Sequence, residues 1–217
     1  MITLVKNIIE LNLDEKEFIV NSIEGGLEKS QNYFNSNRTI TNNGREGERW
    51  NYINEEVKNI LPEKFDVSLC KRKIWGIILI YDKETKCLYS LMKDKRFKEL
   101  RGDIKSNDMH YAAVIANQVN SSFEYETQDQ ITFIENSYEI ANEKMEESFN
   151  DITKYVPGDI EKYVMITFTN DKNELTSISG IVVSSKLDSI YEESWSDMIK
   201  PNYDLAIKEI LSDISLN

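Results

Sequence analysis

The hydrophobic period of the chain changes from 3.6 residues to 2 at about residue 65. Phe65, Val67 and Leu69 alternate with polar residues, which is typical of a half-buried strand. The next run, 74–81, is almost uniformly apolar and β-branched, so it predicts a strand covered on both faces. A polar turn at 82–86 leads to a third strand at 87–92. Residues 65–93 therefore predict an antiparallel meander.

A second hairpin is predicted at 163–184, with strands at 163–169 and 175–183 and a polar turn at 170–173. A lone hairpin is marginally stable in water, so we expect the meander 65–93 and the hairpin 163–184 to share one sheet. The predicted fold is α+β, an antiparallel sheet of about five strands with helices packed on it. Without repeats or linker-like stretches, residues 1–217 are predicted to form a single domain.

Helical periodicity flanks these strands. Asp14 and Glu17 fit a capping box at the first helix start, Gly25 and Gly26 predict a kink within that helix, and Asp108 is the expected cap of a later one. Position 157 is a proline that ends the clearest amphipathic segment. The ranges expected to be helical are 14–34, 45–61, 94–101, 108–120, 130–153, 188–199 and 202–214.

Composition places the chain among globular, cytoplasmic proteins. The longest apolar run, 74–81, is far shorter than the roughly 20 residues needed to cross a bilayer, so no membrane association is expected. The N-terminus lacks the basic and apolar pattern of a secretion signal. Cys70 and Cys87 are too few for a disulfide framework or a four-thiolate zinc site, and reduced thiols fit a cytoplasm.

Charge is distributed unevenly along the chain. The net charge is −12, which argues against general nucleic-acid binding. Residues 36–110 carry 16 Lys and Arg against 12 Asp and Glu, a net of +4, and they contain all six arginines. Residues 111–217 carry 7 against 20, a net of −13. The last half therefore predicts an acidic surface that suits a basic partner.

No complete catalytic or metal motif is found, so no metal and no cofactor is expected. His110, the only histidine, is the one candidate general base; the alternative is a surface or cap histidine. Glu84 and Lys86 fall in a turn, where a metal-dependent nuclease motif does not belong. The carboxylates spaced four apart at 135, 139 and 143 lie opposite an apolar stripe, which indicates a solvated face.

The ends of the predicted meander strands carry two basic runs, at 71–73 and 93–98. In an antiparallel meander the first strand ends at the edge where the third also ends, so two basic runs are expected to meet there. Crowded cations repel unless anions lie nearby, and those anions are the chain's own carboxylates, a partner's surface or phosphates. The anion-binding candidates are Lys71, Arg72, Lys73, Lys93, Arg96 and Arg101.

Several segments between residues 45 and 120 carry a resemblance to a known family. They are Arg49-Trp-Asn-Tyr-Ile-Asn54, the strand 75–81 with its Asp82-Lys-Glu-Thr85 turn, Leu88-Tyr-Ser-Leu-Met92, Arg96-Phe97 and His110-Tyr111. This region resembles an uncharacterised protein family of low-GC Gram-positive bacteria and their mobile elements. The resemblance implies no activity. It favours a role in toxin–antitoxin systems, phage defence or counter-defence.

Two functional hypotheses follow. The first is a non-enzymatic interaction protein whose acidic half binds a protein partner, itself basic. The second is a nucleic-acid-binding or metal-independent ribonuclease-like protein that uses the basic end of the sheet, with His110 assisting and arginines stabilising an anionic transition state. A purely structural or phage-accessory protein is a third reading. A cleft that holds Arg96, Arg101 and His110 together would favour the second hypothesis.

Overall fold

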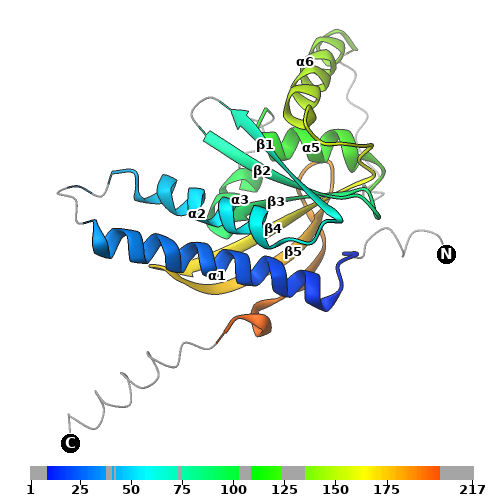
Figure 1. The fold of residues 1–217 in the computed structure, drawn as a ribbon. Helices are drawn as coiled ribbons and strands as arrows, with labels where there is room; N and C mark the ends of the chain where they lie inside the picture. Colours follow the sequence, from blue (N-terminus) through cyan, green and yellow to red (C-terminus); the bar gives the residue numbers. More distant parts are fainter. Residues whose placement is uncertain are drawn as a thin grey trace, which may run out of the picture.

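The fold is α+β and is built on one mixed sheet of six strands. A computed structural model describes residues 9–37, 41, 43–72, 75–102, 109–123 and 135–200. The strands lie side by side in chain order, from β1 at one edge to β6 at the other (Figure 1). They are β1 (Phe65–Arg72), β2 (Trp75–Asp82), β3 (Cys87–Lys93), β4 (Lys162–Asp171), β5 (Glu174–Val183) and β6 (Ser189–Ser194).

The predicted meander and hairpin are both present, but their junction is parallel, so the expectation of an antiparallel sheet is wrong at one position. β3 and β4 run in the same direction, and their pairing extends from Cys87 with Lys162 to Lys93 with Phe168. A parallel pair needs a crossover connection, and the helices between Asp94 and Thr153 provide one. The other four neighbouring pairs are antiparallel.

The sixth strand replaces part of an expected helix. Residues 188–199 have helical spacing, yet β6 pairs with β5, and a 3-10 turn, η3 (Ser196–Met198), follows. The exposed edge of β5 offers backbone partners that outweigh this local periodicity. Trp195 ends the strand fully buried, and a Cβ on Gly180 would lie 2.5 Å from its ring. Glycine at position 180 therefore makes room for the largest side chain of the core.

The long first helix is continuous from Leu13 to Ser36, through both glycines at which a kink was considered. Its cap is Asn12 rather than Asp14: the Asn12 side chain accepts from the Glu15 amide, and the Glu15 carboxylate accepts from the Asn12 amide. A Cβ on Gly26 would lie 2.5 Å from Cα of Ile53. Gly26 thus allows two helices to approach closely instead of bending one of them.

Five α-helices are described, and their positions confirm most of the helical predictions. The expected cap Asp108 and the ranges 130–134 and 202–214 lie outside the described residues. Position 110 instead caps the helix that follows it. The helices are α1 (Leu13–Ser36), α2 (Arg45–Ile60), α3 (Asp94–Gly102), α5 (Tyr111–Val119) and α6 (Glu135–Thr153), with a 3-10 turn, η2 (Ser121–Phe123), after α5.

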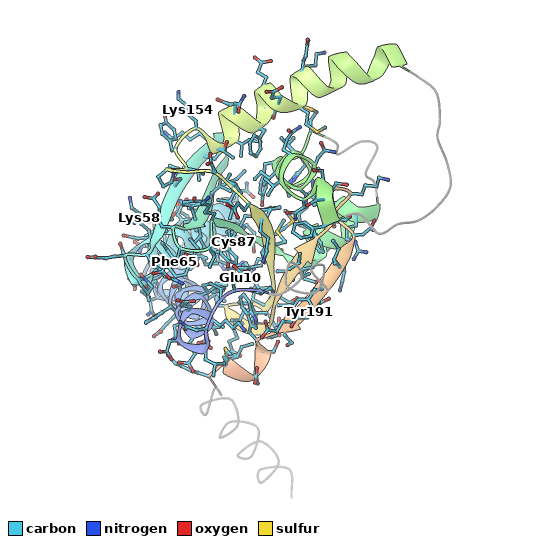
Figure 2. The ribbon with its side chains drawn as sticks, turned by 90° about the vertical axis from the view of Figure 1, so that its right-hand side faces the viewer. Glu10, Lys58, Phe65, Cys87, Lys154 and Tyr191 are labelled. Carbon is cyan, nitrogen blue, oxygen red and sulfur yellow. The ribbon has the colours of Figure 1, made fainter. Side chains whose placement is uncertain are left out.

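Helices cover both faces of the sheet. α1 and α2 lie on one face, and α3, α5 and α6 lie on the other (Figure 1). Each face of the sheet has its own hydrophobic core, and the side chains of β3 alternate between the two. Tyr89 and Leu91 face α1 and α2, whereas Leu88 and Met92 face α3 and α5. Figure 2 shows Cys87 inside the molecule, at the start of this strand. The end of β3 therefore lies between two helical layers.

Candidate functional site

A cavity lies where β2 and β3 separate. Its volume is about 570 Å³, and we call it the fork cavity. The pairing of β2 with β3 covers only three positions and ends at Leu79 with Ser90, so the last residues of β3 diverge from the first residues of β2 (Figure 1). The cavity is lined by Trp50, Asn54, Gly76, Ile77, Ile78, Leu91, Met92, Lys93, Arg96, Met109, His110 and Tyr111.

The fork cavity passes through the plane of the sheet. Ile78 and Leu91 belong to the core beneath α1 and α2, whereas Met92 and Tyr111 belong to the core on the opposite face. Residues of both cores line the same space because the strands between them have separated. Most of the wall is apolar, and the polar groups gather where α3 begins. The cavity thus has an apolar interior and a basic rim.

A second hollow lies on the other side of the same rim. Its volume is about 710 Å³, and it shares Lys93 and Arg96 with the fork cavity. Five of its lining residues are cations and two are carboxylates, in a chain whose net charge is −12. We call it the cationic hollow; it is lined by Glu46, Arg49, Lys93, Lys95, Arg96, Glu99, Phe168, Thr169, Asn170 and Lys172.

Lys93 is the central cation of the site. Its ammonium donates to the side-chain oxygen of Asn170 and lies 4.3 Å from the centre of the Phe168 ring. It takes part in none of the ion pairs found among the described residues. Burial lowers the pKa of Lys93 to about 8, against the opposing effect of Glu46 and together with Arg49. An anionic ligand beside Lys93 would favour the charged ammonium and raise this pKa again.

The two arginines of the hollow each pair with one glutamate of the same helix. Arg96 contacts Glu99 at 3.4 Å, and both side chains are about half exposed, a geometry that contributes little free energy. Arg49 pairs with Glu46 and donates to Asn173 at 2.9 Å. Guanidinium groups bind phosphate or carboxylate through two parallel hydrogen bonds. An anion in the hollow would therefore meet both planar guanidinium donors and the ammonium groups of lysines.

His110 lies on the rim but acts as a helix cap. Its Nδ1 accepts from the Ala112 amide at 3.2 Å, and its ring lies against Tyr111 at a centroid distance of 4.6 Å. An imidazole whose Nδ1 accepts carries its proton on Nε2, so its second nitrogen is a donor. This arrangement suits ligand binding better than proton abstraction. The alternative prediction of a cap histidine is confirmed.

The structure brings together two of the six predicted anion-binding residues. Lys93 and Arg96 line both spaces, and His110 joins them in the fork cavity. Lys71 is exposed on β1 and lines neither space. Arg101 faces Asp188 at 3.7 Å, away from the hollow. Lys73 and the side chain of Arg72 lie outside the described residues, so their position at the rim stays a prediction.

Sequence reasoning missed several lining residues. Arg49, Trp50 and Asn54 come from α2, and Lys172 comes from the turn between β4 and β5. Lys172 had no local signal, because only the parallel pairing of β3 with β4 places that turn beside Lys93. The position of Arg49 directly before Trp50 on an amphipathic helix was the one available hint.

Other candidate chemistry finds no support within the described part of the chain. No group of three His, Cys, Asp or Glu side chains there could hold a metal ion. Neither Cys70 nor Cys87 is in a disulfide, both are buried, and burial raises the pKa of the Cys87 thiol to about 12. Among the same residues, no helix is both long and apolar enough to cross a bilayer.

Fold and site together define an α+β protein with a cation-lined hollow at the open end of a mixed sheet. The chain belongs to the family of unknown function DUF5986, whose match covers residues 6–213. The family match covers more of the chain than the resemblance found in the sequence, which spans residues 45–120. No curated protein matches the chain, and no solved structure does. The function must therefore be argued from the site itself.

Proposed function

We propose that this protein binds single-stranded nucleic acid at the cationic hollow and does not hydrolyse it. The observation that carries the proposal is the excess of five cations over two carboxylates in the hollow of an acidic protein. Such a local excess attracts phosphate, while the acidic remainder of the surface repels the rest of a long duplex. Single strands suit a narrow site because their bases are accessible.

The rim geometry supports binding over cleavage. His110 uses Nδ1 to cap α5, which leaves no imidazole nitrogen to accept a proton from a ribose hydroxyl. Lys93 and Arg96 are placed to contact phosphate oxygens from two adjoining spaces. Of the two activities in the second hypothesis, we therefore favour nucleic-acid binding over ribonuclease-like cleavage. A cytoplasmic location, which two buried thiols outside any disulfide favour, belongs to the same proposal.

Fluorescence anisotropy with labelled ten-nucleotide RNA and DNA strands at 50 mM salt tests the proposal. Arg96→Gln should weaken binding about tenfold, because a charge-assisted hydrogen bond contributes roughly 1.5–3 kcal/mol. It should also reduce the salt dependence by about one phosphate contact. The matched control is Arg101→Gln, on the same helix but facing Asp188, which should bind as the wild type does.

Two outcomes would refute this function. One is a wild-type protein that binds neither strand at 50 mM salt. The other is an equal loss of affinity in the Arg96 and Arg101 variants, since general surface charge would then explain the binding. Incubation with the RNA strand, followed by gel analysis, checks that no cleavage occurs.

A second candidate function rests on α6. Figure 2 shows this helix extending beyond the body of the sheet. Its exposed carboxylates, at positions 143, 146, 147 and 151, take part in none of the ion pairs found among the described residues. We propose that this face binds a basic protein partner, in a toxin–antitoxin, phage-defence or other mobile-element setting. Capture of a partner that is released by high salt, and is lost when these four residues become Gln or Asn, tests it.

A further inference from the structure

The residues whose backbone N–H and C=O groups face the fork cavity can be identified from the hydrogen bonds that β2 forms with β1 and that β3 forms with β4. The Lys83 amide donates to the Lys64 carbonyl at 3.1 Å, so the odd-numbered residues of β2 are bonded to β1 and the even-numbered ones face β3. The Glu161 amide donates to the Lys86 carbonyl at 2.9 Å, so the even-numbered residues of β3 face β4. The odd-numbered residues of β3 consequently face β2.

Four residues therefore direct their backbone groups into the fork. They are Gly76 and Ile78 on β2, and Leu91 and Lys93 on β3, all beyond the last pair of the β2–β3 ladder. The Leu91 carbonyl accepts from the Tyr111 hydroxyl at 3.4 Å. The other amides and carbonyls offer donors and acceptors to a ligand. These groups lie beyond the last pair of the β2–β3 ladder, so a ligand in the cavity that supplies both donors and acceptors can bond to the strand edges there.

The cavity also restricts the shape of that ligand. Its long walls are the separated strands, with Ile77 and Met92 on one side of the sheet and Ile78 and Leu91 on the other. A volume of about 570 Å³ is typical of small-molecule pockets, which span about 300–1,000 Å³. A flat group with apolar faces and a hydrogen-bonding edge satisfies both the walls and the strand edges.

The anionic part of the ligand is specified by the rim. Lys93 and Arg96 line the fork cavity and the cationic hollow alike, so a molecule can place its flat part in one space and its charge in the other. An extended peptide would also pair with the strand edges, but it carries no dense charge for five cations. A nucleobase joined to a phosphate through a ribose has all three features.

We propose that the fork cavity binds the base of a nucleoside monophosphate, free or at the phosphorylated end of a strand, while the cationic hollow binds its phosphate. The inference rests on the proposed function and names the part of the nucleic acid that the site recognises. The backbone groups of Gly76, Ile78 and Lys93 read the edge of the base. Lys93 and Arg96 hold the phosphate at the rim.

Calorimetric titration of the full chain at 50 mM salt tests the base pocket, with AMP, GMP, CMP and UMP compared against ribose 5-phosphate. At least one nucleotide should bind ten times more tightly than ribose 5-phosphate, which carries the same anion without a base. Asn54→Trp fills the cavity from the surface of α2 and should remove that difference while leaving the affinity for ribose 5-phosphate unchanged. The matched control is Asn51→Trp, on the exposed side of the same helix.

The two sources of the monophosphate are separated by a second arm, in which decamers with a 5′-phosphate, a 3′-phosphate or two hydroxyl ends are compared. Tighter binding of one phosphorylated end supports end recognition. Binding of mononucleotides without binding of any decamer supports the base pocket and overturns the proposed function. Equal affinity for the nucleotides and ribose 5-phosphate, or an Asn54→Trp variant that still prefers nucleotides, overturns the base pocket even where the decamers bind.

Discussion

The two edges of β3 make the sharpest contrast in this molecule. Along one edge the strand pairs with β4 at seven positions, from Cys87 to Lys93. Along the other it pairs with β2 at three, ending at Ser90. The even-numbered residues of β3 face β4 along the whole strand, whereas the odd-numbered ones lose their partners on β2 beyond Ser90. The two ends of the sheet also differ in the contacts that hold them.

The closed end of the sheet is fixed by buried polar groups. Asn120, directly after α5, donates to the carbonyls of Tyr163 and Val183 and accepts from the Tyr163 amide. The Tyr163 hydroxyl and Ser90 share a hydrogen bond of 2.7 Å. At the forked end, Trp50 of α2 packs edge-on against Phe168 at 5.5 Å. Directional bonds thus hold the closed end, and side-chain packing holds the open one.

The largest expected effect comes from breaking the closed end. Asn120→Ala leaves one amide and two carbonyls of the buried sheet without partners, and should lower the free energy of unfolding by about 4 kcal/mol. Urea denaturation followed by circular dichroism measures it. Asn117→Ala, an exposed position on the same helix, should change stability by less than about 0.5 kcal/mol. Similar losses in both variants would contradict the contrast.

A smaller loss of stability is expected when the contact between α1 and α2, the helix that lines the fork cavity, is changed. Gly26→Ala places a methyl group against the backbone of Ile53, so α1 and α2 must move apart at a cost of about 2–3 kcal/mol. Because α2 carries Arg49 and Trp50, ligand binding should fall as well. Gly25→Ala meets only the flexible end of Glu56 at 3.2 Å and should shift stability by about 1 kcal/mol or less. Equal effects in the two variants would show that helix contact does not position the site.

The pH dependence of stability tests the environment of Lys93 at the forked end of the sheet. Its folded-state pKa, about 8, lies below the ordinary 10.5, so the folded protein binds fewer protons than the unfolded chain between these values and stability should rise with pH there. Lys93→Met removes that rise. The variant should be about 1–2 kcal/mol more stable than the wild type at pH 7, and the difference should disappear near pH 10.5.

Urea titrations at pH 7, 9 and 10.5 measure this change as a difference between the two proteins, which cancels the titration of other groups. The matched control for removal of a lysine from the same hollow is Lys95→Met, at an exposed position. A Lys93 variant that is less stable than the wild type at pH 7 would mean that the ammonium is already compensated.

The smallest effect is expected at the turn that joins β2 to the closed end of β3. Lys86 has a left-handed backbone, with φ of 54°, and an exposed ion pair with Glu161 at 2.7 Å. Lys86→Gly should raise stability by about 0.5 kcal/mol, because relief of the backbone outweighs a surface ion pair. Lys86→Ala removes the same pair without that relief and should be slightly destabilising. Thermal unfolding of both variants measures the difference, and a glycine variant below the alanine variant would contradict it.

The sequence predicted the local elements of the fold and the centre of its site. The alternation at Phe65, Val67 and Leu69 and the apolar run after it identified the meander. Lys93 and Arg96 were expected at one end of the sheet because the first and third strands of a meander end at the same edge, and His110 was proposed to assist there. Each of these inferences concerned segments that are close in the chain, where the local hydrophobic periodicity predicts the structure.

The remainder depends on contacts between distant segments. The parallel pairing of β3 with β4 leaves no periodic signal, and it alone brings Phe168 and Lys172 to the site. The fork has no signal either, since a paired strand and a separated strand share the same alternation. β6 was predicted as a helix because the spacing of Tyr191 and Trp195 satisfies a helix until the edge of β5 is available.

The order of the strands has a consequence for folding kinetics. Because the six strands lie in chain order, two local meanders can form independently, and the β3–β4 ladder is the one strand pairing that joins distant parts of the chain. Closing the connection from residue 94 to residue 161 should therefore limit the folding rate. Substitutions along this ladder should slow refolding, whereas those at the outer strands should mainly accelerate unfolding.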